Sequence, residues 1–102
     1  MSLPSYEVAR RWLALHAGMP QTFSDPCLAQ QQQALADYVL ICDLLGVEHG
    51  ESLQHAVHRI LTEKLWSRRR FLAERFRRRM PGDPYQAVRE LAAYARYRGW
   101  EP

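Results

Sequence analysis

The sequence has little cysteine and no long apolar run. Its two cysteines, Cys27 and Cys42, fall within one predicted helix, about 22 Å apart along its axis. A disulfide needs Cα atoms within about 7 Å, so the two thiols cannot pair within one chain. No apolar stretch approaches the roughly 20 residues of a membrane span, and the N-terminal residues lack a secretory pattern. We therefore expect a cytoplasmic protein with free thiols and no membrane partner.

Strand-like alternation and the sequence motifs of enzymes are also missing. No run of alternating apolar and polar residues is long enough to predict a strand. The chain contains no glycine-rich phosphate loop, no Gly-x-Ser-x-Gly and no His-Glu-x-x-His. A chain of 102 residues is also too short to build a deep cleft around much besides its own core. We therefore predict a non-enzymatic protein with no catalytic residues and no cofactor.

The histidines offer one weak candidate for a metal site. Glu51, His55 and His58 are spaced at i, i+4 and i+7, and His49 is close in sequence. A carboxylate and two imidazoles on one helix face could hold a divalent ion together with a fourth ligand. The paired Glu-x-x-His motifs of di-iron bundles are absent. We therefore predict no metal site.

Helical periodicity, interrupted by turn residues, is what the sequence does contain. The interruptions fall at Gly18, Pro20, Gly46, Gly50, Pro81, Gly82 and Gly99. Between them, apolar residues recur at helical spacing over residues 5–17, 26–45, 52–80 and 84–98. Asp25 and Asp83 each precede a proline, as an N-cap precedes the first helical residue. The pattern predicts one all-α domain over residues 1–102, an irregular bundle of four helices.

The apolar stripe of the predicted 52–80 helix changes face along its length. Its first half carries Leu53, Val57, Ile60 and Leu61, and its second half carries Leu65, Trp66, Leu72, Phe76 and Met80 on a different side. Either the chain breaks, with Ser67 capping a separate fifth helix, or one long helix buries both faces. The absence of Gly and Pro favours continuity. That helix would span about 43 Å, too long for its neighbours to cover, which predicts a homodimer.

Positive charge is concentrated in the same segment. The net charge is +3, yet residues 64–80 hold eight positive groups and one negative group, and seven of the positive groups are arginines. Arg68, Phe71, Arg75 and Arg78 are spaced to share one helix face. An aromatic ring among guanidinium groups is typical of a binding hot spot. The alternative is that Phe71 continues the first apolar stripe into the core while the arginines solvate the outside.

A second aromatic and basic group closes the chain. Tyr94 and Arg98 form an i, i+4 pair, and Tyr97 and Trp100 lie beside them in sequence. These rings either cover the flank of the bundle or extend the binding face.

Together these patterns predict a small regulator, adaptor or inhibitor that docks on the acidic surface of a larger protein. We assign the contacts to Arg68, Phe71, Arg75, Arg78, Arg79, Tyr97 and Trp100. The alternative is a small nucleic-acid-binding subunit whose arginines contact phosphates. The chain lacks recognisable nucleic-acid motifs, and its basic segment carries more apolar bulk than phosphate tracking requires, which favours a protein partner. A self-assembling structural protein, whose dimer contacts occupy the same face, is the third hypothesis.

Overall fold

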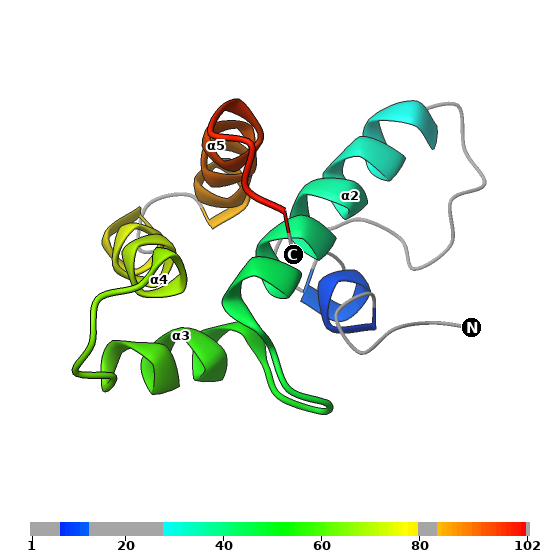
Figure 1. Ribbon diagram of the computed structural model, residues 1–102. Helices are drawn as coiled ribbons and strands as arrows, with labels where there is room; N and C mark the ends of the chain where they lie inside the picture. Colours follow the sequence, from blue (N-terminus) through cyan, green and yellow to red (C-terminus); the bar gives the residue numbers. More distant parts are fainter. Residues whose placement is uncertain (1–6, 13–27, 80–83, 102) are drawn as a thin grey trace.

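The computed structural model describes residues 7–12, 28–79 and 84–101, and every regular element in these ranges is a helix. After the helical residues 7–12 come α2 (Leu28–Leu45), α3 (Leu53–Leu61), α4 (Arg68–Arg79) and α5 (Pro84–Tyr97). In Figure 1, α2 crosses the right half of the molecule, and α5, α4 and α3 are arranged around the left. The predicted all-α class is confirmed. The expected caps Asp25 and Asp83 lie outside the described residues.

One hydrophobic core joins these helices. Its largest fully buried side chains come from α2, α3, α4 and α5 and are Tyr38, Ile41, Leu45, Leu53, Ile60, Leu72, Phe76 and Val88. The helix of residues 7–12 contributes Trp12, whose ring centroid lies 4.7 Å from that of Tyr38 and 5.9 Å from that of Phe76. Trp12 therefore links α2 and α4 across the core. Within the described ranges, no helix is both long enough and apolar enough to cross a bilayer.

A glycine ends α2 and another follows α5, each with the same backbone geometry. Gly46 and Gly99 adopt φ values of 67° and 69°, a left-handed conformation that costs other residues energy. After α5, the Gly99 N–H donates to the Arg96 carbonyl at 3.0 Å and the Trp100 N–H donates to the Ala95 carbonyl at 2.9 Å. These two bonds form a Schellman motif, which reverses the chain direction at the helix end. Trp100 is thereby turned back toward the bundle, and it packs against the core.

The chain bends between α3 and α4, so the expectation of one continuous helix over residues 52–80 is wrong. α3 ends at Leu61, and residues 62–67 are not helical. The Ser67 Oγ accepts a hydrogen bond from the Arg70 N–H at 3.2 Å, and the Ser67 carbonyl accepts one from the Phe71 N–H at 3.1 Å. Ser67 therefore caps α4, which confirms the alternative of a separate fifth helix.

The two apolar faces of this segment explain the bend. Leu53 and Ile60 of α3 and Leu72 and Phe76 of α4 are all fully buried in the same core. A straight helix would point the two faces in different directions, whereas a bend brings both to one core. The Ser67 hydroxyl satisfies one of the N–H groups that the break leaves without an intrahelical partner, so the bend forms without Gly or Pro. Because α3 and α4 are two short helices on one core, the length of this segment no longer predicts a homodimer.

A partly buried ion pair connects α2 to α5. The Asp37 carboxylate accepts hydrogen bonds from Arg96 Nη1 at 2.6 Å and from Gln33 Nε2 at 3.1 Å. The Asp37 side chain is only 7% exposed, so losing these donors would leave a desolvated charge. This contact joins residues far apart in sequence, and periodicity alone did not predict it.

Substituting Ser67 by Ala tests the bend through the sign of the stability change. In a continuous helix the substitution would be neutral or stabilising, because Ala is the better helix former. With Ser67 as an N-cap, we expect Ser67→Ala to lower the free energy of unfolding by about 1 kcal/mol. Ser67→Asp should retain most of the wild-type stability because Asp is an equally good cap. Urea unfolding of the three proteins measures the difference, and a stabilised Ser67→Ala would contradict the cap.

Candidate functional site

Four aromatic side chains meet on one side of the bundle, and we call them the aromatic cluster: Trp66, Phe71, Tyr94 and Trp100. The Phe71 ring is central, with centroids 6.0 Å from Trp66, 5.8 Å from Tyr94 and 6.0 Å from Trp100. Tyr94 and Trp100 lie 5.5 Å apart at an interplanar angle of 82°. Most of these pairs are edge-to-face, which is a favoured geometry for aromatic rings.

Local structure at two turns brings these rings together. Trp66 lies in the bend immediately before Ser67, and Phe71 follows in the first turns of α4. Tyr94 lies on α5, one turn before its end, and the Schellman motif at Gly99 returns Trp100 to the same place. The cluster therefore combines a loop residue, two helices and the segment after α5. Residues nearly thirty positions apart in the chain become neighbours.

Arginine side chains lie over two rings of the cluster. The Arg75 Cζ is 4.7 Å from the centroid of the Phe71 ring. The Cζ atoms of Arg68 and Arg98 are 5.7 Å and 5.8 Å from the centroid of Trp100. At these distances the ring quadrupole attracts the cation, with about 0.5–1 kcal/mol per contact at exposed sites. These contacts hold three guanidinium groups around the cluster.

The arginines of α4 divide into two groups. Three have intramolecular carboxylate partners: Arg69 with Glu63, Arg70 with Glu74, and Arg79 with Glu90. Among the described residues, no carboxylate lies within ion-pair distance of Arg68, Arg75, Arg77 or Arg78. Two arginines of the second group, Arg68 and Arg75, are the ones that lie over the aromatic cluster. The basic run is therefore only partly neutralised within the chain.

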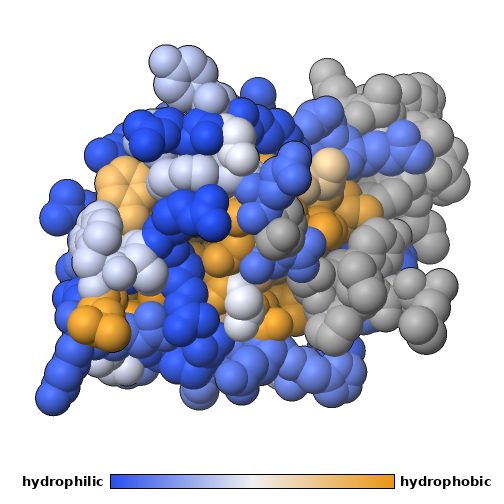
Figure 2. Space-filling model, viewed as in Figure 1, coloured by the Kyte–Doolittle hydropathy of each residue, from blue (hydrophilic) through white to orange (hydrophobic). Residues whose placement is uncertain are grey.

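The cluster has a buried support and an exposed edge. Phe71 and Trp100 are half-buried and pack against the core. In contrast, Trp66 is 67% exposed and its neighbour Leu65 is 83% exposed. Figure 2 shows pale and orange groups at the left of the molecule, where α4 and the bend before it lie, between strongly hydrophilic side chains. Large apolar side chains are thus presented to solvent beside unneutralised arginines.

The structure brings together four of the seven residues assigned from sequence, namely Arg68, Phe71, Arg75 and Trp100. Arg78 and Tyr97 are exposed, and neither joins the ring contacts of the cluster. Arg79 is engaged with Glu90. Phe71 is half-buried. It packs against the core, as one prediction had it, and it also belongs to the partly exposed aromatic cluster, as the other had it.

Leu65 and Trp66 were not predicted to lie at the site, and Tyr94 and Arg98 were predicted only as part of a group that could extend the binding face. The predicted continuous helix placed Leu65 and Trp66 on the same apolar face as Leu72. The signal that could have corrected this was Ser67, because a serine N-cap places the two preceding residues in a loop.

The side chains of the histidine segment are placed differently from the set of ligands that the sequence spacing offered. Among the described residues, no three His, Cys, Asp or Glu side chains are arranged to hold an ion. Glu51 is instead bound by Arg59, whose Nε and Nη2 atoms lie 2.9 Å and 3.0 Å from its carboxylate oxygens. Arg59 Nη2 also donates to the Gly46 carbonyl at 3.0 Å. These bonds connect α3 to the end of α2, and the Arg59 hydrogen bonds lower the pKa of Glu51 below its ordinary value.

The Cys42 thiol is chemically protected. Its side chain is fully buried in the core. Burial, together with the charge of neighbouring Asp43, raises the pKa of Cys42 to about 12. A thiol must ionise to act as a nucleophile, so Cys42 lacks the environment of a reactive cysteine.

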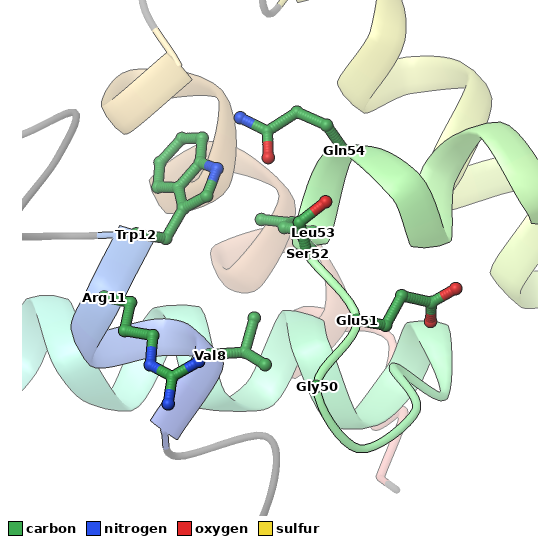
Figure 3. Close-up of a pocket in the computed structure, with 8 residues that line it drawn as sticks. All are labelled: Val8, Arg11, Trp12, Gly50, Glu51, Ser52, Leu53 and Gln54. Carbon is green, nitrogen blue, oxygen red and sulfur yellow. The ribbon is translucent and has the colours of Figure 1, made fainter.

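A small pocket lies between the helix of residues 7–12 and the loop that leads into α3. It has a volume of about 160 Å³ and is lined by Val8, Arg11, Trp12 and residues 50–54. Figure 3 shows Trp12 and Gln54 at one end, while the Glu51 side chain points away from the 7–12 helix. Pockets for drug-sized ligands and cofactors occupy about 300–1,000 Å³. We therefore assign no ligand to this pocket.

Comparison with protein-family models, with curated protein sequences and with solved structures finds no match for this chain. The geometry of its own residues is therefore what supports a function.

Replacing Glu51 by Gln tests the α2–α3 connection. Because the folded-state pKa of Glu51 is lowered, its ionised form stabilises the fold above pH 4.5, and this contribution disappears as the pH falls through the lowered value. We expect Glu51→Gln to lower the free energy of unfolding by about 1 kcal/mol at pH 7, with the deficit shrinking as the pH falls below 4.5. Urea unfolding across this pH range measures it, with Glu101→Gln, which changes an exposed carboxylate, as control. A deficit that does not change with pH would contradict the assigned pKa.

Thiol labelling tests the burial of Cys42. In a Cys27→Ser variant, where Cys42 is the remaining thiol, we expect a thiol reagent such as DTNB to react only as the protein unfolds. The labelling rate should rise with urea in parallel with the loss of helical circular dichroism. Fast labelling of the native protein at pH 8 would show that the thiol is accessible.

Proposed function

We propose that the protein is a non-enzymatic regulator or adaptor that docks on an acidic surface of a larger protein through the aromatic cluster and its arginines. The observation that carries this proposal is the exposure of Leu65 and Trp66, at 83% and 67%, beside arginines that no described carboxylate neutralises. Regulators and inhibitors share this mode of action, so both fall within the proposal. A cytoplasmic setting belongs to it as well, because Cys42 is a buried free thiol.

The exposed apolar side chains of the bend favour a protein partner. Burying a side chain the size of leucine contributes roughly 1.5–3 kcal/mol, and tryptophan adds a larger area. Tryptophan and arginine are also among the residues most enriched in interface hot spots. Leu65 and Trp66 gain little of this stabilisation in the isolated chain, since both are mostly exposed to solvent. A partner that covers them would recover it.

The partial burial of the aromatic rings and the guanidinium groups that cover them disfavour a nucleic-acid partner. Proteins that bind single strands stack successive bases on open aromatic faces. Here Phe71 and Trp100 are half-buried, and each already lies beneath at least one guanidinium group. Of the cluster, Trp66 alone is mostly exposed, and beside it stands the aliphatic Leu65, which offers a base nothing to stack on. The surface therefore suits side chains of a protein better than bases.

Capture of partners from nuclease-treated native lysate tests the proposal. Trp66→Ala should lose the proteins that the wild type retains, because it removes the exposed edge of the cluster. His58→Ala is the control, since His58 is exposed on α3 and is not among the residues assigned to the contact. Retention of the same proteins by Trp66→Ala, or loss of all captured material on nuclease treatment, would overturn the proposal. Equal loss in His58→Ala would overturn it too.

A further inference from the structure

Building on the proposed docking function, we infer that the partner presents an amphipathic helix whose exposed face carries acid, apolar and acid residues at i, i+4 and i+7. This helix would lie along α4 and match its arginines and its central ring. The inference rests on the spacing of Arg68, Phe71 and Arg75 along α4. It also rests on the charge and exposure of the two arginines.

The spacing of the arginines gives the distance that the partner has to match. Arg68 and Arg75 are seven residues apart on α4, which places their backbones about 10.5 Å apart on nearly the same side of the helix. Phe71 lies between them on that side, at i+3. An acidic residue pair at i and i+7 of another helix has the same separation and the same orientation. A strand matches less well, because residues on one of its faces recur about every 6.6 Å.

The guanidinium groups of Arg68 and Arg75 are positioned by aromatic rings and can still bind carboxylates. The Arg75 guanidinium lies 4.7 Å from the Phe71 centroid, and the Arg68 guanidinium lies 5.7 Å from the Trp100 centroid. A guanidinium restrained over a ring keeps N–H donors for a second partner and loses less conformational freedom on binding. No described carboxylate lies within ion-pair distance of either group. Charge complementarity therefore calls for two acids.

An apolar residue between the two acids fits the remaining surface. The exposed Trp66 ring, whose centroid lies 6.0 Å from that of half-buried Phe71, provides an apolar area beside the arginines. A leucine at i+4 of the partner helix would reach this area while its flanking acids reach Arg68 and Arg75. Leu65, 83% exposed in the bend, can cover the end of that helix. Helix-in-groove recognition commonly uses anchors at this spacing.

Two synthetic helical peptides of identical composition test the inference. Both are side-chain-stapled, because short helices are marginal in water. One carries Glu, Leu and Glu at i, i+4 and i+7, and the other places the two Glu residues on the opposite face. Titration of the fluorescein-labelled peptides, followed by anisotropy, should show the first binding at least about tenfold more tightly than the second. Equal affinities would overturn the inference.

Variants of α4 make the test specific to the site. Arg75→Gln should weaken the first peptide by about tenfold, because a charge-assisted hydrogen bond is lost. Arg77→Gln is the matched control, since Arg77 is exposed on the same helix but lies over no ring of the cluster. It removes the same charge and should leave the affinity unchanged. Equal weakening by both variants would show general charge attraction and overturn the inference.

Further arms separate this inference from the docking proposal. If neither peptide binds while Trp66→Ala still abolishes protein capture, the helical partner is wrong and the docking function stands. If an oligo-dT strand binds instead and Arg68→Gln weakens it, both proposals are wrong. The third possible occupant is a second copy of this chain, which sedimentation of the wild type and Trp66→Ala would detect. A wild-type dimer that the substitution dissociates would assign the surface to self-association and overturn the inference.

Discussion

Two apolar faces of one segment have to reach a single core, and the bend at residues 62–67 is how the chain satisfies both. Leu53 and Ile60 enter the core from α3, and Leu72 and Phe76 enter it from α4. Burial of such side chains contributes roughly 1.5–3 kcal/mol each, which exceeds the net contribution of about 0.5–1.5 kcal/mol from each hydrogen bond that an uninterrupted helix would keep. The same bend leaves Trp66 outside the core. Core packing therefore determines what the surface exposes.

The arginines of α4 show how weak interactions can set geometry without adding much stability. Arg69, Arg70 and Arg79 pair with acids at partly exposed positions. Such pairs are worth about 0–1 kcal/mol, and ring contacts at exposed sites about 0.5–1 kcal/mol. Neither kind of contact decides the fold. Their effect is to fix which guanidinium groups are occupied and which ones remain around the aromatic cluster.

Local sequence signals predicted much of the fold, and they named about half of the residues that the structure gathers at the candidate site. Helical periodicity, Gly46 and Gly99 predicted the helix type and two C-terminal ends correctly, because these features act within a few residues. The bend was misjudged because the absence of Gly and Pro was given more weight than the change of apolar face. The Asp37–Arg96 pair and the contact of Phe71 with Trp100 were out of reach, since both depend on how separate helices pack.

The proposed docking surface depends on turn residues that take no part in it. Ser67 sets where α4 begins, and so places Trp66 before the helix and Phe71 within it. The positive φ of Gly99 permits the Schellman bonds that return Trp100 to the cluster. Both turns form locally, while the contact between their aromatic residues requires the whole core. The proposed surface therefore forms when the core closes, and Ser67 and Gly99 would affect docking only through the positions that they give Trp66, Phe71 and Trp100.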